Sequence, residues 1–435
     1  MSSKILIFGS GGRESAIAWK LAQSSQVSEI VVAPGNIGMT RMQKTSIYPC
    51  RLREEEMLSL AQMLQPDLII IGPEQPLVDG VGELLKNNGF LILGPYRLAA
   101  QLEKSKIFSK MFMTEFSLPT AEYAFYDSYE AALRGLETWN FEDGLVIKTD
   151  SLAGGKGVVL CDNQDAAREV LFDFMKNSAI SVQTERILFE KKLKGREVSA
   201  FALLDGEAVI PLGYACDYKR AQDGDKGPNT GGMGTFTSPN FPDDAQKKKI
   251  FEIFQKTNAG MKHRGTPYQG VLFAGLMIDG EGEQSDVKIL EFNIRFGDPE
   301  AQSLLPALDG DLFTLLKATA QAKLSLFQHA PVQASKTSVH VVLASQGYPS
   351  LNTLKSPLLT GQEISIPENI PTQAEIFFSG VREENGVLVN SGGRVLGVTY
   401  TAASIEEARK GAYQLVEQIN FKGKHYRTDI AKGCL

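Results

Sequence analysis

The stretch ILEFNIRFGDPE, residues 289–300, is the most informative part of this 435-residue chain. Its alternation predicts a strand with one apolar face in a core, because successive side chains point to opposite faces. The other face carries Glu291, Asn293 and Arg295. A carboxylate and an amide oxygen suit Mg²⁺, and a guanidinium beside them suits a phosphate. The alternative is a solvated face with a salt bridge, which is less favoured because the turn at 296–300 adds two carboxylates.

A second strand, predicted at residues 145–148, runs into the glycine-rich segment 151–157. Lys148 points to one defined side of that strand, and Lys156 lies within the loop. A strand lysine beside a mobile glycine loop predicts a phosphate clamp with a lid. The spacing is not that of a Walker A loop. An exposed hairpin with a solubilising lysine is the alternative.

Glycines also follow the first predicted strand, where GSGGRE spans residues 9–14 and opens a helix. The free N–H groups of such a helix N-terminus can hold a phosphate. NAD is disfavoured, because Glu14 occupies the third glycine position and residues 33–35 provide no acidic residue for a ribose. The alternative is that these glycines serve only a tight turn.

A further glycine-rich loop spans residues 226–235 and follows Lys219 and Arg220. Its backbone N–H groups could bind a carboxylate, and either cation could bind a phosphate. A flexible surface loop is the alternative.

The order of predicted elements indicates several α/β and α+β units. Strands at 5–8, 30–33, 68–71 and 91–93 alternate with helical patterns and predict a doubly wound parallel sheet, whose loops meet at one ligand-binding edge. The following α+β part has predicted helices at 99–114, 130–138 and 165–176 and strands at 123–125, 145–148, 158–161, 187–190, 198–204, 272–278 and 287–294. After a linker at 329–336, strands are predicted at 338–344, 376–381, 386–390 and 395–401, with a hairpin turn at Asn385-Gly386 and a helix at 404–418. The predicted domains are 1–103, 104–328 with a mobile lid at about 120–190, and 329–435.

Composition excludes several classes of protein. The chain is 43% apolar and 22% charged, as in ordinary globular domains. It has 45 basic and 51 acidic residues, so its net charge of −6 offers no attraction to nucleic acid or an anionic membrane. Four separated cysteines, strand-sized apolar runs and no signal peptide predict a cytoplasmic protein in a reducing compartment. No zinc or nucleophile motif is present.

Taken in order, these blocks resemble the ATP-grasp superfamily of carboxylate–amine ligases, and within it the phosphoribosylamine–glycine ligase family. The resemblance runs from about residue 4 to residue 429. The blocks that carry it are residues 11–14, 33–36, 72–77, 105–106, 227–234, 273–277, 291–300 and 392–396.

The resemblance implies a multidomain α/β and α+β fold: an N-terminal doubly wound parallel sheet, a central ATP-grasp fold of two α+β lobes, and a C-terminal mixed α/β domain. It implies ATP-dependent joining of glycine to 5-phosphoribosylamine through glycyl phosphate. The products would be glycinamide ribonucleotide, ADP and phosphate, in purine synthesis. Mg²⁺ or Mn²⁺ would assist, and we expect a monomer without nucleic-acid or membrane partners.

The resemblance also implies roles for individual residues. Lys148, Lys156 and Arg295 would be catalytic, and Glu291 and Asn293 would bind the metal. ATP would contact Lys106, Lys148, Gly154, Gly155, Lys156, Gly157, Glu190, Lys191, Leu193 and Glu197. The other substrates would contact Gly12, Arg13, Glu14, Asn36, Glu74, Asp217, Lys219, Arg220, Asn229, Thr230, Gly231, Gly232 and Arg394.

The chain departs from the family pattern at a few positions. Ser15 stands where His is usual and Ser10 where Asn is usual, which bears on the sugar-phosphate end. Thr149 and Ser151 replace the commoner Ala and Gly beside the predicted lid. Two other functions remain open: a sibling ATP-grasp ligase with a different carboxylate or amine, and a catalytically idle nucleotide sensor.

Overall fold

The computed structural model describes residues 2–152, 157–177, 184–327, 332–349 and 357–434. Gly154, Gly155 and Lys156 lie outside these residues. Among the described residues, no helix is long and apolar enough to cross a membrane.

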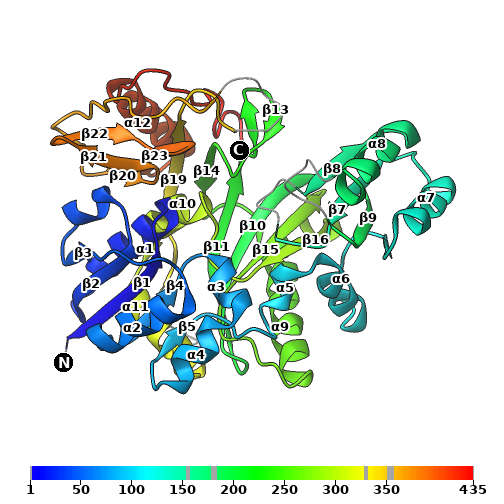
Figure 1. The fold of residues 1–435 in the computed structure, drawn as a ribbon, viewed down its shortest axis with the longest axis horizontal. Coiled ribbons are helices and arrows are strands. Elements are labelled where there is room, and N and C mark those ends of the chain that lie inside the picture. Colours follow the sequence, from blue (N-terminus) through cyan, green and yellow to red (C-terminus); the bar gives the residue numbers. More distant parts are fainter. Residues whose placement is uncertain (1, 153–156, 178–183, 328–331, 350–356, 435) are drawn as a thin grey trace.

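The N-terminal part is a parallel sheet of five strands with the order β3-β2-β1-β4-β5 (Figure 1). Its strands are β1 (Ser3–Gly9), β2 (Val27–Pro34), β3 (Thr45–Ile47), β4 (Leu68–Ile71) and β5 (Ile92–Leu93). Its helices are α1 (Gly12–Ala22), α2 (Glu54–Leu64), α3 (Glu74–Asp79) and α4 (Val81–Asn87), with the 3-10 turn η1 (Ile37–Arg41). The predicted doubly wound parallel sheet is confirmed. The three residues of β3 were not predicted, because none of them is fully buried and the segment lacks an apolar run.

A separate α+β lobe projects from the body of the molecule, on the right of Figure 1. Its sheet has the order β6-β9-β7-β8. The elements are β6 (Tyr123–Tyr126), α7 (Tyr129–Thr138), β7 (Leu145–Thr149), β8 (Val158–Cys161), α8 (Gln164–Met175) and β9 (Ile187–Lys191). The lobe has a core of its own, in which Phe189 contacts Tyr126 and Trp139 edge to face. This lobe corresponds to the segment predicted at about 120–190, and the predicted elements are confirmed within one or two residues.

The rest of the chain is built on one sheet of eight strands with the order β16-β15-β10-β11-β14-β19-β23-β20. Its strands are β10 (Arg196–Leu204), β11 (Val209–Asp217), β14 (Gly234–Thr237), β15 (Gly270–Asp279), β16 (Asp286–Asn293), β19 (Thr337–Ala344), β20 (Ala374–Phe378) and β23 (Arg394–Ala402). Strand β14 pairs with β19 from Gly234 opposite Val341 to Thr237 opposite Ser338. The central and C-terminal parts of the chain therefore share a continuous sheet.

Smaller elements complete these layers. The short strands are β12 (Arg220–Gln222), β13 (Lys226–Asn229), β17 (Leu308–Asp309), β18 (Gln333–Ala334), β21 (Val381–Glu384) and β22 (Val387–Asn390). The helices are α5 (Gln101–Lys104), α6 (Lys106–Glu115), α9 (Asp244–His263), α10 (Glu300–Ala307), α11 (Leu312–Ala320) and α12 (Ile405–Gln418), with the 3-10 turns η2 (Gly282–Gln284) and η3 (Leu324–Phe327). Positive φ angles at Asn385 and Gly386 confirm the predicted hairpin turn between β21 and β22.

Two predicted elements are each divided in the structure. The helix predicted at 99–114 breaks at Ser105, which is extended and caps α6 by accepting a hydrogen bond from the Phe108 amide. The Ser105 hydroxyl also donates to Asp150 at 2.7 Å, so the break fixes the start of α6 against the small lobe. The strand predicted at 376–381 divides into β20, which ends at Phe378, and β21, which begins at Val381. Gly380 lies between them, where a Cβ would lie 2.7 Å from the Cα of Gly392.

Candidate active site

One face of the large sheet carries the polar residues predicted from the sequence. Across four neighbouring strands, Glu291 lies opposite Gly275, Gly275 opposite Ser199, and Ser199 opposite Ala215. Residues directly opposite one another share a face, so this register sets a row across β16, β15, β10 and β11. A Cβ on Gly275 would lie 3.3 Å from Cγ of Glu291, so glycine leaves room for that side chain.

The Glu291 carboxylate lies among cations. Burial raises its pKa, but Lys219, Lys106 and Lys148 outweigh that effect and hold the pKa below its usual value. Lys106 comes from the start of α6 and donates to the Ser151 carbonyl at 3.1 Å. Lys148 comes from β7 in the small lobe, so cations from two lobes surround one carboxylate.

The donors at this point fit a hard divalent cation. Glu291 offers a carboxylate and Asn293 an amide oxygen on the same strand, and oxygen ligands are those that Mg²⁺ prefers. The described part of the chain holds no group of three or more His, Cys, Asp or Glu residues that could enclose a metal. Such an incomplete protein donor set suits an ion that keeps waters and binds substrate phosphates.

A buried ion pair network was missed by the sequence analysis. The Glu190 carboxylate lies 2.9 Å from the Lys148 ammonium and 3.1 Å from that of Lys110, and all three side chains are buried. Lys110 also donates to the Thr120 hydroxyl. Burial lowers the pKa of Lys110 to about 8 although Glu190 opposes the shift. The available signal was the spacing of four residues from Lys106, which puts both lysines on one helix face.

Lys219 is surrounded by carboxylates. Its ammonium pairs with Glu197 and lies 3.9 Å from Asp217, and these acidic neighbours raise its pKa although burial opposes them. Burial, with Glu197 and Glu300, raises the pKa of Asp217 to about 8, although Lys219 acts in the other direction. Among the described residues, no partner forms a hydrogen bond with Oδ1 of Asp217, whose side chain is 4% exposed. The Ser199 hydroxyl donates to Glu300 at 3.2 Å.

Arg295 follows the end of β16 and is held between two carboxylates. Its Nε lies 2.8 Å from Glu74 of α3, and its Nη2 lies 2.8 Å from Glu103 of α5. Glu103 also accepts a hydrogen bond from the Ile294 amide at 2.7 Å. Glu74, predicted at the ribose-phosphate end, thus contacts Arg295, the arginine predicted to be catalytic. Glu103 was not predicted, because nothing local distinguishes it from other helix-surface glutamates.

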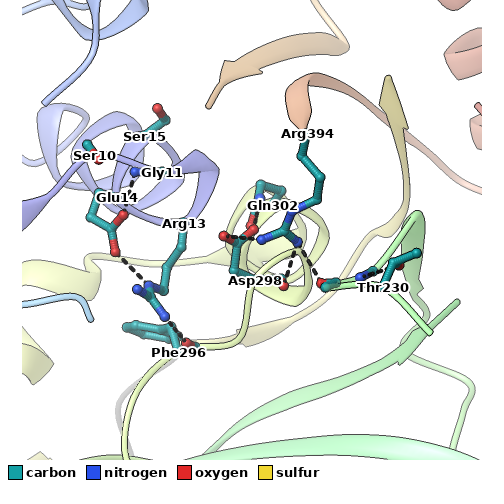
Figure 2. A network of polar contacts seen from close by, with 12 residues as sticks. Ser10, Gly11, Arg13, Glu14, Ser15, Thr230, Phe296, Asp298, Gln302 and Arg394 are labelled. Carbon is teal, nitrogen blue, oxygen red and sulfur yellow. Dashed lines mark hydrogen bonds and ion pairs between the residues drawn. The ribbon is translucent and has the colours of Figure 1, made fainter. Parts of the chain in front are cut away.

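The Asp298 carboxylate joins three segments at the other end of the site (Figure 2). One oxygen lies 2.8 Å from Nη2 of Arg394, and the other accepts a hydrogen bond from the side-chain Nε2 of Gln302 at 2.8 Å. Nη1 of Arg394 donates to the carbonyls of Asp298 at 2.8 Å and of Gly231 at 2.6 Å. Burial raises the pKa of Asp298, but Arg394 and Arg13 outweigh it and keep the group ionised.

The first helix meets this network through its N-terminus. The Glu14 carboxylate accepts from the Gly11 amide at 2.7 Å and from Nε of Arg13 at 2.6 Å (Figure 2). A Cβ on Gly12 would lie 2.5 Å from the Gln302 amide nitrogen. Glycine at this position leaves room for the Gln302 side chain between α1 and α10.

Asn36 fastens the N-terminal sheet to the C-terminal part. Its Nδ2 donates to the carbonyls of Ser10 at 2.8 Å and Phe378 at 2.9 Å, and its Oδ1 accepts from the Gly38 amide. Ser15, where histidine is usual, donates to the same Phe378 carbonyl at 2.9 Å. The serine therefore acts as a second link between these parts.

The glycine-rich loop after β13 is held in a defined shape. Both the amide and the hydroxyl of Thr230 donate to the Lys219 carbonyl, at 2.7 and 2.9 Å. The Gly231 amide donates to the Tyr348 hydroxyl at 2.9 Å. Gly232 has φ +108°, a conformation that side chains disfavour. Arg220 and Asn229, also predicted to contact substrate, pair across the β12–β13 hairpin.

The remaining predicted nucleotide residues lie at the edge of the small lobe. Lys191 is paired with Asp143 at 3.0 Å, and this hydrogen-bonded ion pair raises its pKa. Leu193 lines a cavity of about 170 Å³ with Met277. The Gly157 carbonyl accepts a hydrogen bond from the Thr149 amide at 2.9 Å. This bond joins the strand before the predicted glycine-rich loop to the last residue of that loop.

Comparisons with known proteins agree over almost the whole chain. Models of the phosphoribosylglycinamide synthetase N domain, ATP-grasp (A) domain and C domain match residues 3–103, 104–301 and 338–433. The phosphoribosylamine–glycine ligase of Clostridium acetobutylicum is 39% identical over 430 residues, which cover 99% of each chain. The bifunctional purine biosynthetic protein of Pichia angusta is 40% identical over 98% of this chain, which spans 53% of that longer relative.

A solved structure gives the same result. The phosphoribosylamine–glycine ligase of Thermotoga maritima superposes with a TM-score of 0.82 at 33% identity, and the match covers 98% of this chain and 100% of that one. The predicted fold class and the resemblance are confirmed. This chain belongs to the phosphoribosylamine–glycine ligase (phosphoribosylglycinamide synthetase) family of ATP-grasp ligases.

Proposed function

We propose that this protein joins glycine to 5-phosphoribosylamine at the expense of ATP, giving glycinamide ribonucleotide, ADP and phosphate in purine biosynthesis. The observation that carries the proposal is the position of Glu291 among Lys106, Lys148 and Lys219, on a strand that runs on to Arg295 and Asp298. Nucleotide, metal and sugar-phosphate functions are thereby aligned along one strand and its turn.

The nucleotide would bind between the small lobe and the large sheet. Lys106 and Lys148 would hold its phosphates. Because Glu190 also pairs with Lys110, this carboxylate neutralises the charge of Lys148 only in part. Glu291 and Asn293 would hold Mg²⁺ or Mn²⁺. The bound ion would neutralise charge on the transferred phosphoryl group. We also propose that Lys156 and its neighbouring glycines, which lie outside the described residues, close over the phosphates as a lid.

Two displacements would make up the reaction. A glycine carboxylate oxygen attacks the γ-phosphorus of ATP, and ADP leaves, so that glycyl phosphate forms. The sugar amine then attacks the carbonyl carbon, loses a proton, and expels phosphate that retains one former glycine oxygen. Arg295, held by Glu74 and Glu103, would neutralise the charge that develops on the phosphoryl oxygens. Positioning and charge supply most of such catalysis.

The other substrates would bind toward the Asp298 network. Oδ1 of Asp217, which has no partner among the described residues, would accept a hydrogen bond from the glycine ammonium, whose positive charge would favour the ionised form of this carboxyl. The N–H groups of 229–232 suit a carboxylate. The N-terminus of α1, with Arg13, and the opposing Arg394 would hold the ribose phosphate. Glu14 and Asn36 would shape this site through the backbone contacts described above.

Several finer points belong to the same proposal. We propose a cytoplasmic monomer without nucleic-acid partners; the four well-separated cysteines of the sequence support a reducing compartment. We propose units at 1–103, 104–328 and 329–435, and the matched models at 3–103, 104–301 and 338–433 support these boundaries.

ADP release with component omission tests the function. Purified protein with Mg²⁺-ATP, glycine and freshly generated phosphoribosylamine should release ADP, and omission of either co-substrate should abolish sustained release. Dependence on a different carboxylate or amine would indicate the sibling ligase. No release under any combination would indicate the nucleotide sensor.

Oxygen transfer tests the acyl phosphate. Glycine labelled with ¹⁸O in its carboxylate should deliver label to the released phosphate, because the oxygen that attacks phosphorus leaves with it. Mass spectrometry of phosphate from one turnover would detect the label. Unlabelled phosphate with normal product formation would refute glycyl phosphate.

Replacement of the proposed metal ligand should remove turnover and leave the fold intact. We expect Glu291→Gln to lower kcat at least about a hundredfold, because the carboxylate serves the phosphoryl transfer and the apolar face of β16 is unchanged. Steady-state ADP release and thermal unfolding would be measured together. The exposed Glu281, changed to Gln, is the matched control and should retain activity. Unchanged kcat and magnesium dependence in Glu291→Gln would contradict the assignment.

The lowered pKa of Lys110 predicts a specific pH dependence. Below pH 8 Lys110 is charged and shares Glu190; above pH 8 it loses its proton, and Glu190 then engages Lys148 more strongly. The KM for ATP should therefore rise above pH 8. In Lys110→Met it should be higher by about five- to tenfold already at pH 7 and depend less on pH. Initial rates from pH 6.5 to 9.5 at saturating glycine would show this. A rise of the same size in both proteins would exclude Lys110 as its cause.

A further inference from the structure

A C-terminal segment of the chain, residues 425–429, lies along the β12–β13 hairpin. Three residues of the hairpin, Ala221, Asp223 and Gly224, form hydrogen bonds with this C-terminal segment. His425 Nε2 lies 2.8 Å from the Ala221 carbonyl, and the Thr428 amide donates to Asp223 at 2.8 Å. The Gly224 amide donates to Asp429 at 2.8 Å. We call residues 425–434 the C-terminal clamp.

Arg427 is the centre of the C-terminal clamp. Its side chain is 1% exposed and forms two bonds of 2.7 Å to the Asp429 carboxylate. Its Nη1 donates across to the hairpin, to Asp225 at 2.8 Å and to the Arg220 carbonyl at 3.1 Å. The guanidinium also lies 4.9 Å from the centre of the Tyr218 ring. One buried cation thus bonds the start of β12, at Arg220, and the turn before β13, at Asp225. The rest of the hairpin is mostly exposed.

The residues next to this hairpin belong to the proposed substrate site. Tyr218, held by Arg427 and by the Ala431 amide at 2.9 Å, precedes Lys219. Lys219 pairs with Glu197 through its ammonium and with Thr230 through its carbonyl. A shift of the hairpin would therefore move the Lys219 ammonium and the loop that begins at Thr230.

Polar contacts rather than a core must set the position of this hairpin. Residues 222–229 contain no large apolar side chain, and most of them are exposed. Directional hydrogen bonds from a buried guanidinium fix geometry well, because its planar fork matches a carboxylate in two bonds. The proposed nucleotide residues on β7, α6 and β16 form no hydrogen bond or ion pair with Arg427 among the described contacts.

We propose that Arg427 is a positioning residue for the amino-acid substrate: it holds the β12–β13 hairpin so that Lys219 and the 229–232 loop are placed to receive a small carboxylate. The inference rests on the proposed function for the identity of that substrate as glycine. Loss of Arg427 contacts then weakens glycine binding more than ATP binding, which the hairpin reaches through the pair of Lys219 with Glu197.

Arg427→Lys keeps the charge but removes the fork that reaches Asp429, Asp225 and Arg220 together. We expect its KM for glycine to rise about tenfold, with KM for ATP changed by less than about twofold, because hydrogen bonds to charged groups contribute about this much. Asp225→Asn removes only the hairpin-side ion pair of a residue whose side chain is 71% exposed, and should raise KM for glycine less. Arg382→Met breaks an exposed pair with Glu384 and should change neither constant.

Hydrogen exchange supplies a second measurement that does not depend on the substrate. Amides of residues 218–232 should exchange faster in Arg427→Lys than in the parent, while those of the lobe at 187–191 should not. Equal rises in both KM values, or unchanged KM for glycine with unchanged exchange at 218–232, would overturn the proposal. If Arg427→Lys does not fold, the same measurements on Asp225→Asn decide. A parent enzyme without glycine-dependent ADP release would refute the proposed function, and the exchange data would still test the clamp.

Discussion

The partly buried ion pair of Asp298 and Arg394 is the contact on which the arrangement of this molecule depends. Asp298 follows strand β16, which carries Glu291 and Asn293, and Arg394 begins β23 in the C-terminal part. The same guanidinium reaches the Gly231 carbonyl, and the same carboxylate holds Gln302, against which Gly12 of α1 packs. Removing one partner would leave the other charge partly buried and without its counter-ion, which is unfavourable. The position of three separate chain segments therefore depends on one ion pair.

Ion pairs of this kind recur along the whole site. Arg295 lies between Glu74 and Glu103, and Glu190 lies between Lys110 and Lys148. The side chains of Arg295 and Lys148 are thus oriented by carboxylates of the protein itself. Such preorganisation reduces the reorganisation needed when charge develops in the reaction. The small lobe has its own core and reaches the large sheet through Lys148, whose ammonium donates a hydrogen bond to the Leu290 carbonyl at 3.3 Å.

The C-terminal part contributes to the fold and to the site in different ways. Strands β19, β23 and β20 continue the large sheet, so their hydrogen bonds extend the surface that carries Glu291. The final residues instead bind the β12–β13 hairpin through Arg427, where few apolar groups are available. Hydrogen bonds between strands position β19, β23 and β20, whereas hydrogen bonds from the buried Arg427 guanidinium position the β12–β13 hairpin.

Local pattern was sufficient for much of this molecule. The strands at 68–71 and 158–161 were predicted to the residue, because their apolar runs are bounded by turn signals. The shared face of Glu291 and Asn293 follows from the two-residue period of any strand. Other features depended on distant partners: the pairing of β14 with β19, the break at Ser105 that Asp150 supports, and the roles of Lys110, Glu103 and Arg427. The sequence determines which residues share a face, because that is set by backbone geometry over a few residues. Only the tertiary structure decides which charge meets which, because those partners lie up to hundreds of residues apart and are selected by burial.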